Sequence, residues 1–202
     1  MIDWALAAAA IIAILYVVFF PKRKRPSEFL KSYESVEFNV AAAEKHPCHK
    51  ILCGLDEYLE IVGFDRAWLY RNRENGDMIY VYVNRNYSVF FEISLEGDEF
   101  RIGFMTQLLS GTIMLSSDME PCAEILAGGW VIFRHIEKEG IAKLKDAPAE
   151  DRGGAFIELF ESHVNGLSRS AERGDRPAYC NARNYLDCRD YFLACKSFVK
   201  NN

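Results

Sequence analysis

The spacing of hydrophobic residues changes along the chain, and each change predicts a different kind of element. Residues 4–20 form one continuous apolar run without a charged residue. Residues 28–62 place apolar side chains at helical spacing, residues 67–116 alternate apolar and polar positions as strands do, and helical spacing returns from residue 148. This order predicts an N-terminal transmembrane helix followed by a soluble α+β domain.

The apolar run has the length and the flanking residues of a retained membrane anchor. From Trp4 to Phe20 it would extend about 25 Å as a helix, close to the hydrocarbon thickness of about 30 Å. A secretory signal peptide carries its positive charges before the apolar run and a small-residue cleavage site after it. Here the charges follow the run and no such site is present. We therefore expect residues 1–21 to be a transmembrane anchor and residues 22–27 a basic collar.

The collar predicts the orientation of the anchor. Its cations are Lys22, Arg23, Lys24 and Arg25. Because cations beside a membrane-spanning segment stay on the cytoplasmic side, we expect the N-terminus outside the cell (inner) membrane, the collar at the lipid headgroups and residues 28–202 in the cytoplasm. Without the collar and Asp3 the chain has 20 basic and 28 acidic residues, a net charge of about −8. This charge argues against nucleic acid as a partner.

Small residues follow one side of the predicted anchor. Ala5, Ala9 and Ala13 repeat at four-residue spacing, so they lie on one ridge of the helix. Such a ridge lets two membrane helices approach closely. The pattern therefore predicts a homodimer through the transmembrane helix.

Residues that could bind a metal do not form a complete motif. Four zinc-ligand residues lie within eight positions: His46, Cys48, His49 and Cys53. Structural zinc sites usually bring together two short pairs, and no second compact pair is present in this sequence. A cytoplasmic location also predicts that the six cysteines are free thiols. We predict no metal and no cofactor.

Catalytic signatures are incomplete as well. His135-Ile136-Glu137 has the H-x-E form of zinc deaminases, but in those enzymes two cysteines follow it, whereas Cys122 precedes it here. His163 falls at the polar edge of a predicted helix, a position typical of a solvated or hydrogen-bonded side chain. We therefore predict a non-catalytic module that binds another protein, in the manner of an immunity or inhibitor protein or a scaffold. The alternative is a membrane-tethered hydrolase that uses the thiol of Cys48 or another cysteine.

The middle of the chain predicts an antiparallel meander of five or six strands. Asn75-Gly76 and other short polar turns separate the alternating runs. The expected strands are residues 67–73, 78–83, 87–95, 100–109 and 112–116, with 130–136 as a sixth. Helices are expected at residues 28–45, 49–62, 148–169 and 183–199, packed on one side of the sheet.

Alternation along these strands also predicts a binding surface. Ile79, Val81 and Val83 are expected on a core face together with Phe91 and Ile93. The opposite face is rich in aromatic and methionine side chains, which are enriched at the centres of interfaces. Its proposed binding residues are Tyr80, Tyr82, Phe90 and Met105. The alternative is that a helix covers this face too.

Overall fold

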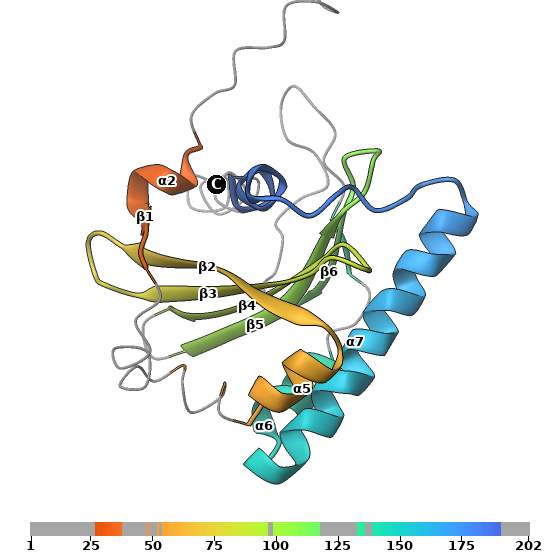
Figure 1. The fold of residues 1–202 in the computed structure, drawn as a ribbon, viewed down its shortest axis with the longest axis horizontal. Helices are drawn as coiled ribbons and strands as arrows, with labels where there is room; N and C mark the ends of the chain where they lie inside the picture. The colour runs from red at the N-terminus through yellow and green to blue at the C-terminus, as the bar shows by residue number, and fades with distance from the viewer. Residues whose placement is uncertain are drawn as a thin grey trace, which may run out of the picture.

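The structure is a computed structural model that describes residues 27–37, 48, 52, 54–96, 99–117, 133–135 and 139–190. These residues form a seven-stranded sheet whose strands lie in sequence order (Figure 1). The strands are β1 Tyr33–Ser35, β2 Phe64–Asn72, β3 Met78–Asn84, β4 Val89–Glu96, β5 Glu99–Gln107, β6 Ile113–Ser117 and β7 Phe133–His135. The helices are α2 Phe29–Ser32, α5 Asp56–Ile61, α6 Glu139–Asp146 and α7 Ala149–Glu172. Residues 182–190 form a further helix, here called the 182–190 helix.

The sheet confirms the predicted α+β meander. Strands β1 to β6 pair antiparallel with their neighbours, and β7 lies parallel to β6. The β2–β3 turn contains Gly76 at a φ of +79°, a backbone conformation that glycine adopts without steric penalty. In the same turn the side-chain oxygen of Asn72 accepts a hydrogen bond from the backbone N–H of Glu74 at 2.8 Å. Local turn chemistry thus forms the hairpin that the Asn-Gly pair predicts.

The elements before β2 differ from the prediction. Helix α2 ends at Ser32, and Tyr33 enters β1 opposite Asn72, so the helix predicted for residues 28–45 is wrong at its centre. The spacing of apolar residues could not predict this strand, because β1 forms through pairing with the distant edge of β2. Helix α5 spans Asp56–Ile61, in the second half of the helix predicted for residues 49–62, and follows a turn at residues 54–55. The short α6 was not predicted at all.

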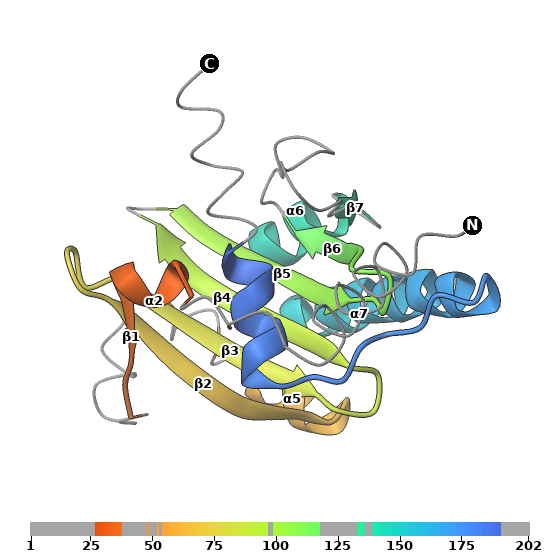
Figure 2. The same cartoon turned by 90° about the horizontal axis from the view of Figure 1, so that it is seen from above.

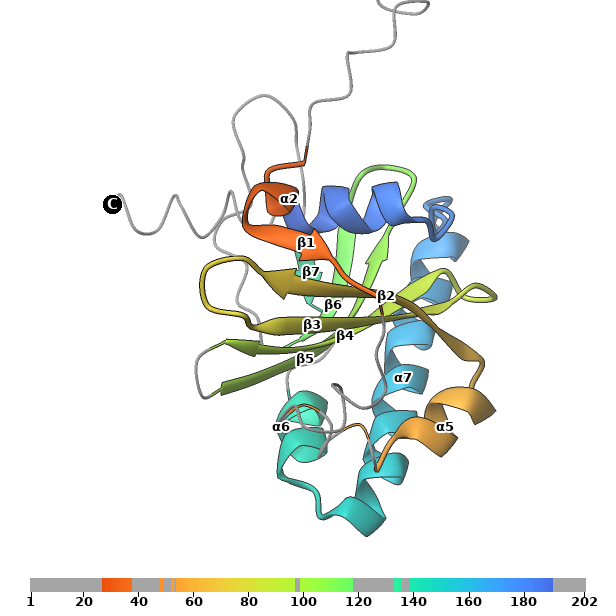
Figure 3. The ribbon, with the colours of Figure 1, turned by 60° about the vertical axis from the view of Figure 1, so that its left-hand side comes forward.

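Helices cover both faces of the sheet, which corrects the prediction that they pack on one side (Figure 3). Helices α5, α6 and α7 lie against one face, here called the α7 face. Helix α2 and the 182–190 helix lie against the other, here called the 182–190 face. Figure 2 shows the 182–190 helix running across the strands. With both sides covered, β3 is buried at every position from Ile79 to Asn84.

Helix α7 confirms the predicted long helix and extends it. It begins at Ala149, after Pro148, and carries two acidic residues in its first turn, which suits the positive end of the helix dipole. Its buried stripe includes Phe156, Leu159, Phe160 and Leu167. Beyond its end, Gly174 adopts a φ of +87° and the N–H of Asp175 donates to the carbonyl of Ser170 at 3.1 Å. This arrangement is a Schellman motif, which terminates the helix.

The predicted anchor, its collar and the ridge of Ala5, Ala9 and Ala13 lie outside the described residues. Within the described ranges, no helix combines the length and the apolar character needed to cross a bilayer. The described residues begin at Ser27, the last residue of the predicted collar. The anchor therefore stays a prediction from the sequence.

Candidate functional site

The four predicted binding residues do not share one face of the sheet. Residues opposite each other in an antiparallel pair project to the same side. Tyr82 lies opposite Phe91, whereas Phe90 lies opposite Met105. Tyr80 and Tyr82 therefore belong to the α7 face, and Phe90 and Met105 belong to the 182–190 face. The predicted common face is wrong because alternation within a strand does not determine which residues of the next strand share its side; the register does.

These four side chains are also part of the core. The exposed fraction is 2% for Tyr80, 3% for Tyr82 and 1% for both Phe90 and Met105. On the 182–190 face the ring centroid of Phe90 lies 5.6 Å from that of Tyr185. Phe90 and Met105 line neither of the two clefts described below, whereas Tyr80 and Tyr82 line the first of them. A surface for a partner must therefore be sought at the clefts.

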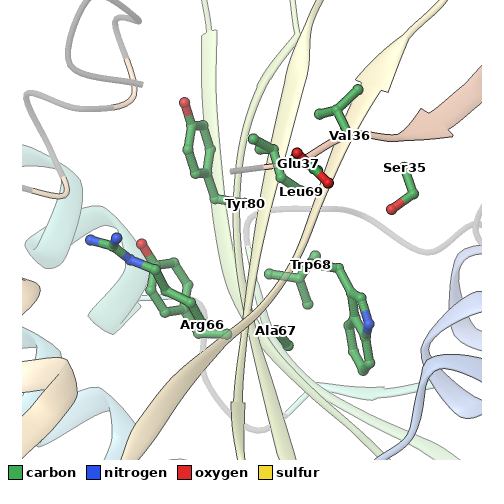
Figure 4. Close-up of a pocket in the computed structure, with 10 residues that line it drawn as sticks. Ser35, Val36, Glu37, Arg66, Ala67, Trp68, Leu69 and Tyr80 are labelled. Atoms are coloured by element: carbon green, nitrogen blue, oxygen red, sulfur yellow. The ribbon is translucent and has the colours of Figure 1, made fainter. Parts of the chain in front are cut away.

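A β-bulge in β2 accompanies a cleft at the edge of the sheet. The register of β2 against β3 shifts between Arg66 and Trp68, so Ala67 is the extra residue. The adjacent cleft, here called the bulge cleft, has a volume of about 280 Å³. Figure 4 shows the side chains of Arg66 and Tyr80 on one side of β2 and that of Trp68 on the other. The charged and aromatic residues that line the bulge cleft are Glu37, Arg66, Trp68, Tyr80 and Tyr82.

The bulge cleft offers groups for recognition. Arg66 lies 3.6 Å from the carboxylate of Asp56, and because both side chains are about half exposed, solvent screens this pair. Burial raises the pKa of Tyr80 and of Tyr82 to about 12, although the Arg66 charge opposes the rise at Tyr82. Both phenols are thus protonated near neutral pH. A guanidinium, a carboxylate and aromatic rings together suit one side chain of a partner or a small polar molecule.

The described cysteines are placed in the core and not as nucleophiles. Cys48, the candidate of the hydrolase alternative, is fully buried, and burial raises the pKa of its thiol to about 12. Burial also raises the pKa of Cys180 and Cys188. A nucleophilic cysteine needs the opposite, a lowered pKa and access to substrate. The other zinc candidates, His46, His49 and Cys53, lie outside the described residues.

Among the described residues, no group of three or more histidine, cysteine or carboxylate side chains is arranged to hold a metal ion. The strand that contains His135 is described, but its side chain is not. No described cluster therefore adds to the incomplete zinc and deaminase motifs of the sequence.

His163 is buried, although its position on α7 predicted a polar edge. Its Nδ1 lies 2.9 Å from Ser116 Oγ and its Nε2 lies 3.1 Å from Thr106 Oγ1. Complete burial lowers the pKa of His163 to about 3, so the ring is neutral near pH 7. One hydroxyl donates to the ring and the other accepts from it. This contact joins β5 and β6 to α7, and its burial suits packing more than proton transfer to a substrate.

A second cleft lies where the C-terminal end of α7 meets the β3–β4 turn. This α7-end cleft has a volume of about 360 Å³. Val164, Leu167 and Pro177 supply apolar lining, and Tyr87 and Arg176 also line it. The sequence did not reveal the cleft, because its residues come from three separate parts of the chain.

Known proteins do not indicate which cleft is used. Comparison of the chain with protein families, curated proteins and solved structures gives no match. The choice between the two clefts therefore rests on their own contacts and charges.

Proposed function

We propose that the chain is a single-pass membrane protein that presents a non-catalytic protein-binding domain to the cytoplasm. The observation that carries this proposal is the docking of the first described residues against the 182–190 helix. Asp190 Oδ1 accepts hydrogen bonds from Ser27 Oγ at 2.7 Å and from the backbone N–H of Phe29 at 2.8 Å. Ser27, the last residue of the predicted collar, is thus held against the 182–190 helix.

The side chain of Phe29 anchors the first described residues in the core. Its side chain is fully buried, and its ring stacks on Tyr33 at a centroid distance of 4.4 Å. It also meets the rings of Tyr70 and Tyr185 edge-on, at 5.1 and 6.3 Å. The guanidinium of Arg189 lies 5.2 Å from its centroid, within cation–π distance. The aromatic cluster and the Asp190 hydrogen bonds together hold residues 27–29 against the rest of the domain.

Because Ser27 is docked on the domain, the predicted tether is short. Only residues 21–26 separate the apolar run from Ser27, and fully extended they would span about 20 Å. The tether would hold the domain at the membrane surface, within reach of partners in or on the membrane. A collar bound to anionic headgroups and an acidic domain repelled by them support this arrangement.

Membrane extraction and a reporter fusion test the topology. We expect the chain to stay in the membrane fraction after an alkaline carbonate wash, and a reporter active only in the cytoplasm to work when fused after Asn202. Neutral residues in place of Lys22, Arg23, Lys24 and Arg25 should weaken the orientation preference. Release by carbonate, or a reporter active only outside, would overturn the proposal.

Cys48 separates this proposal from the thiol-hydrolase alternative. We expect Cys48→Ala to keep cellular function, with Cys180→Ala as a matched control because that thiol is also buried. A hydrolase that uses Cys48 would lose function in the first variant and keep it in the second. Folded levels of both variants are compared first, so that a loss of stability is not read as a loss of chemistry.

Self-association through the anchor is part of the proposal. Ala9→Leu fills the centre of the small-residue ridge and should abolish membrane-dependent dimers in a crosslinking assay. Ala7→Leu adds the same bulk on the other side of the helix and should leave the dimers intact. Equal crosslinking of both variants would remove the dimer from the proposal.

A further inference from the structure

We infer that the α7-end cleft docks an acidic segment of a partner protein, one that places an aromatic or large aliphatic side chain beside carboxylates. The inference rests on the proposed protein-binding function and adds a location and a partner chemistry to it. Four features of the described residues carry it: the shape of the cleft, the rigidity of its wall, the exposed apolar residues around it and its charge.

The cleft can hold one large apolar side chain. Its volume is about 360 Å³ and its lining is largely apolar. Tyr87 is 47% exposed, and its ring meets Phe160 edge-on at a centroid distance of 5.7 Å. A half-exposed tyrosine that is already held by another ring loses little side-chain freedom when a partner covers it.

The wall of the cleft is formed before any partner arrives. The carboxylate of Asp175 accepts hydrogen bonds from Ser110 Oγ at 2.6 Å and from Ser110 N–H at 3.1 Å. The N–H of Leu109 donates to the carbonyl of Arg176 at 2.9 Å. Residues 175–178 are thereby attached to the β5–β6 turn. Binding against this wall would carry a small ordering cost.

Exposed apolar side chains gather at this end of the sheet. Among the described residues, five large apolar side chains are exposed. Three of the five are Tyr87, which lines the cleft, and Leu109 and Tyr179, which adjoin the wall segment. Leu109 is 72% exposed and its backbone pairs with Arg176, and Tyr179 is 65% exposed and follows Ala178 in sequence. Tyrosines and leucines clustered around a cleft are a typical contact surface for a protein.

The lining of the cleft is positively charged, whereas the domain is acidic. Arg176 lines the cleft, and no described carboxylate does; the exposed Arg85 and Arg169 adjoin lining residues in sequence. The acidic residues that adjoin the lining are Glu172 and Asp175, and Asp175 is engaged by Ser110; Asp65 lies 3.9 Å from Arg85 as a solvent-screened pair. The domain as a whole carries about −8. Carboxylates of a partner are therefore repelled by most of the domain and attracted to this end, where arginine can bind them in a bidentate manner.

The bulge cleft provides an internal control. It is also lined by aromatic rings, but its arginine, Arg66, is accompanied by the carboxylates of Asp56 and Glu37. An acidic peptide has no electrostatic reason to prefer it. A charge reversal at Arg66 should therefore leave binding of such a peptide unchanged.

Fluorescence anisotropy with three labelled peptides tests the inference on the full chain in lipid nanodiscs. The first peptide carries a Leu-Phe pair flanked by two glutamates on each side. The second has lysines in place of the glutamates, and the third has serines in place of the Leu-Phe pair. We expect micromolar binding of the first peptide only, weakened by salt.

Two charge reversals locate the binding. Arg176→Glu should weaken binding of the first peptide by about tenfold or more, whereas Arg66→Glu should leave it unchanged. Tyr87→Ser, a surface change, should weaken it as well, and circular dichroism checks that all three variants fold. The inference is overturned if the first peptide does not bind, if the lysine peptide binds equally well, or if Arg66→Glu has the larger effect.

The outcomes also separate the inference from the proposed function. A chain that stays in the membrane fraction but does not bind the acidic peptide through Arg176 refutes the inference alone. A chain that carbonate releases, yet that binds this peptide through Arg176, refutes the membrane topology and leaves the docking site in place.

Discussion

The two faces of the sheet hold their buried polar groups in different ways. On the α7 face the buried ring of His163 is neutral and is hydrogen-bonded by Ser116 and Thr106 at 2.9 and 3.1 Å. On the 182–190 face Arg189 donates to the carboxylate of Glu92 at 2.8 Å, and their side chains are only 5% and 2% exposed. One face thus contains a neutral contact, and the other a buried ion pair.

The ion pair is part of a larger cluster that reaches the start of the domain. Tyr185 Oη donates to the second carboxylate oxygen of Glu92 at 2.8 Å, and the Arg189 guanidinium lies near the ring of Phe29. The next residue, Asp190, binds Ser27. The 182–190 face therefore couples the predicted tether to the core, whereas the α7 face has no such link among the described residues. We therefore expect substitution of a charged residue to destabilise the 182–190 face most, and protonation to destabilise the α7 face most.

Loss of Arg189 should have the largest effect on stability. Arg189→Ala leaves the Glu92 carboxylate buried without its cation, which typically costs about 3 to 5 kcal/mol. The double variant Arg189→Met with Glu92→Gln should recover most of this loss, because a neutral amide can still accept from Tyr185. Urea unfolding of the full chain in detergent micelles measures both. A cost under about 1 kcal/mol for Arg189→Ala would contradict the idea that the pair is desolvated.

Acid should destabilise the α7 face through His163. Its pKa falls from an ordinary value of 6.5 to about 3 on folding, so between these pH values the unfolded state binds more protons. Stability therefore falls as the pH drops through this window, by roughly 2 to 3 kcal/mol between pH 6.5 and 4.5. His163→Gln should show a smaller slope over the same range. Identical slopes would show that the histidine is not buried as a neutral ring.

Two adjacent glycines of α7 provide a matched pair of substitutions with effects on stability of intermediate size. A Cβ at Gly153 would overlap the ring of Tyr58 on α5, whereas a Cβ at Gly154 would meet nothing within 4 Å. Gly153→Ala should destabilise the domain by about 1 to 2 kcal/mol through overpacking. Gly154→Ala should stabilise it by about 0.5 to 1 kcal/mol, because alanine favours the helix. Thermal unfolding of the two variants should shift in opposite directions; a shift in the same direction would refute the close α5–α7 contact.

Substitution of the residue that caps the start of the 182–190 helix should change the stability least. The side-chain oxygen of Asn181 accepts from the backbone N–H of Asn184 at 3.0 Å, as an N-cap residue does. Asn181→Ala should cost about 1 kcal/mol, while Asn181→Asp should retain the cap. Hydrogen exchange of the Phe29 amide, which binds Asp190, should speed up in the alanine variant only. Unchanged exchange in that variant would mean that the helix holds the tether without help from its cap.

Features that repeat within one element were predicted well from the sequence. The strands β3 and β5, the Asn75-Gly76 turn and the apolar stripe of α7 each depend on neighbours a few residues apart, and the structure confirms all of them. The predicted anchor also follows from local composition, and it stays a prediction because residues 1–26 lie outside the described part of the chain. Neither cleft could be predicted, since each collects residues from separate segments.

What the sequence determined by itself was the kind and order of the strands from β2 to β6 and the helix α7, because backbone propensity, turn chemistry and the period of the apolar pattern act locally. Only the tertiary structure decided which strand residues share a face, that β1 pairs with β2, that His163 is buried and that helices cover both sides. These features depend on the register between strands and on contacts between distant residues such as Glu92 and Arg189. A one-residue change in register moves every side chain of a strand to the opposite face without altering the pattern along the chain, and for that reason the predicted binding face could not be read from alternation alone.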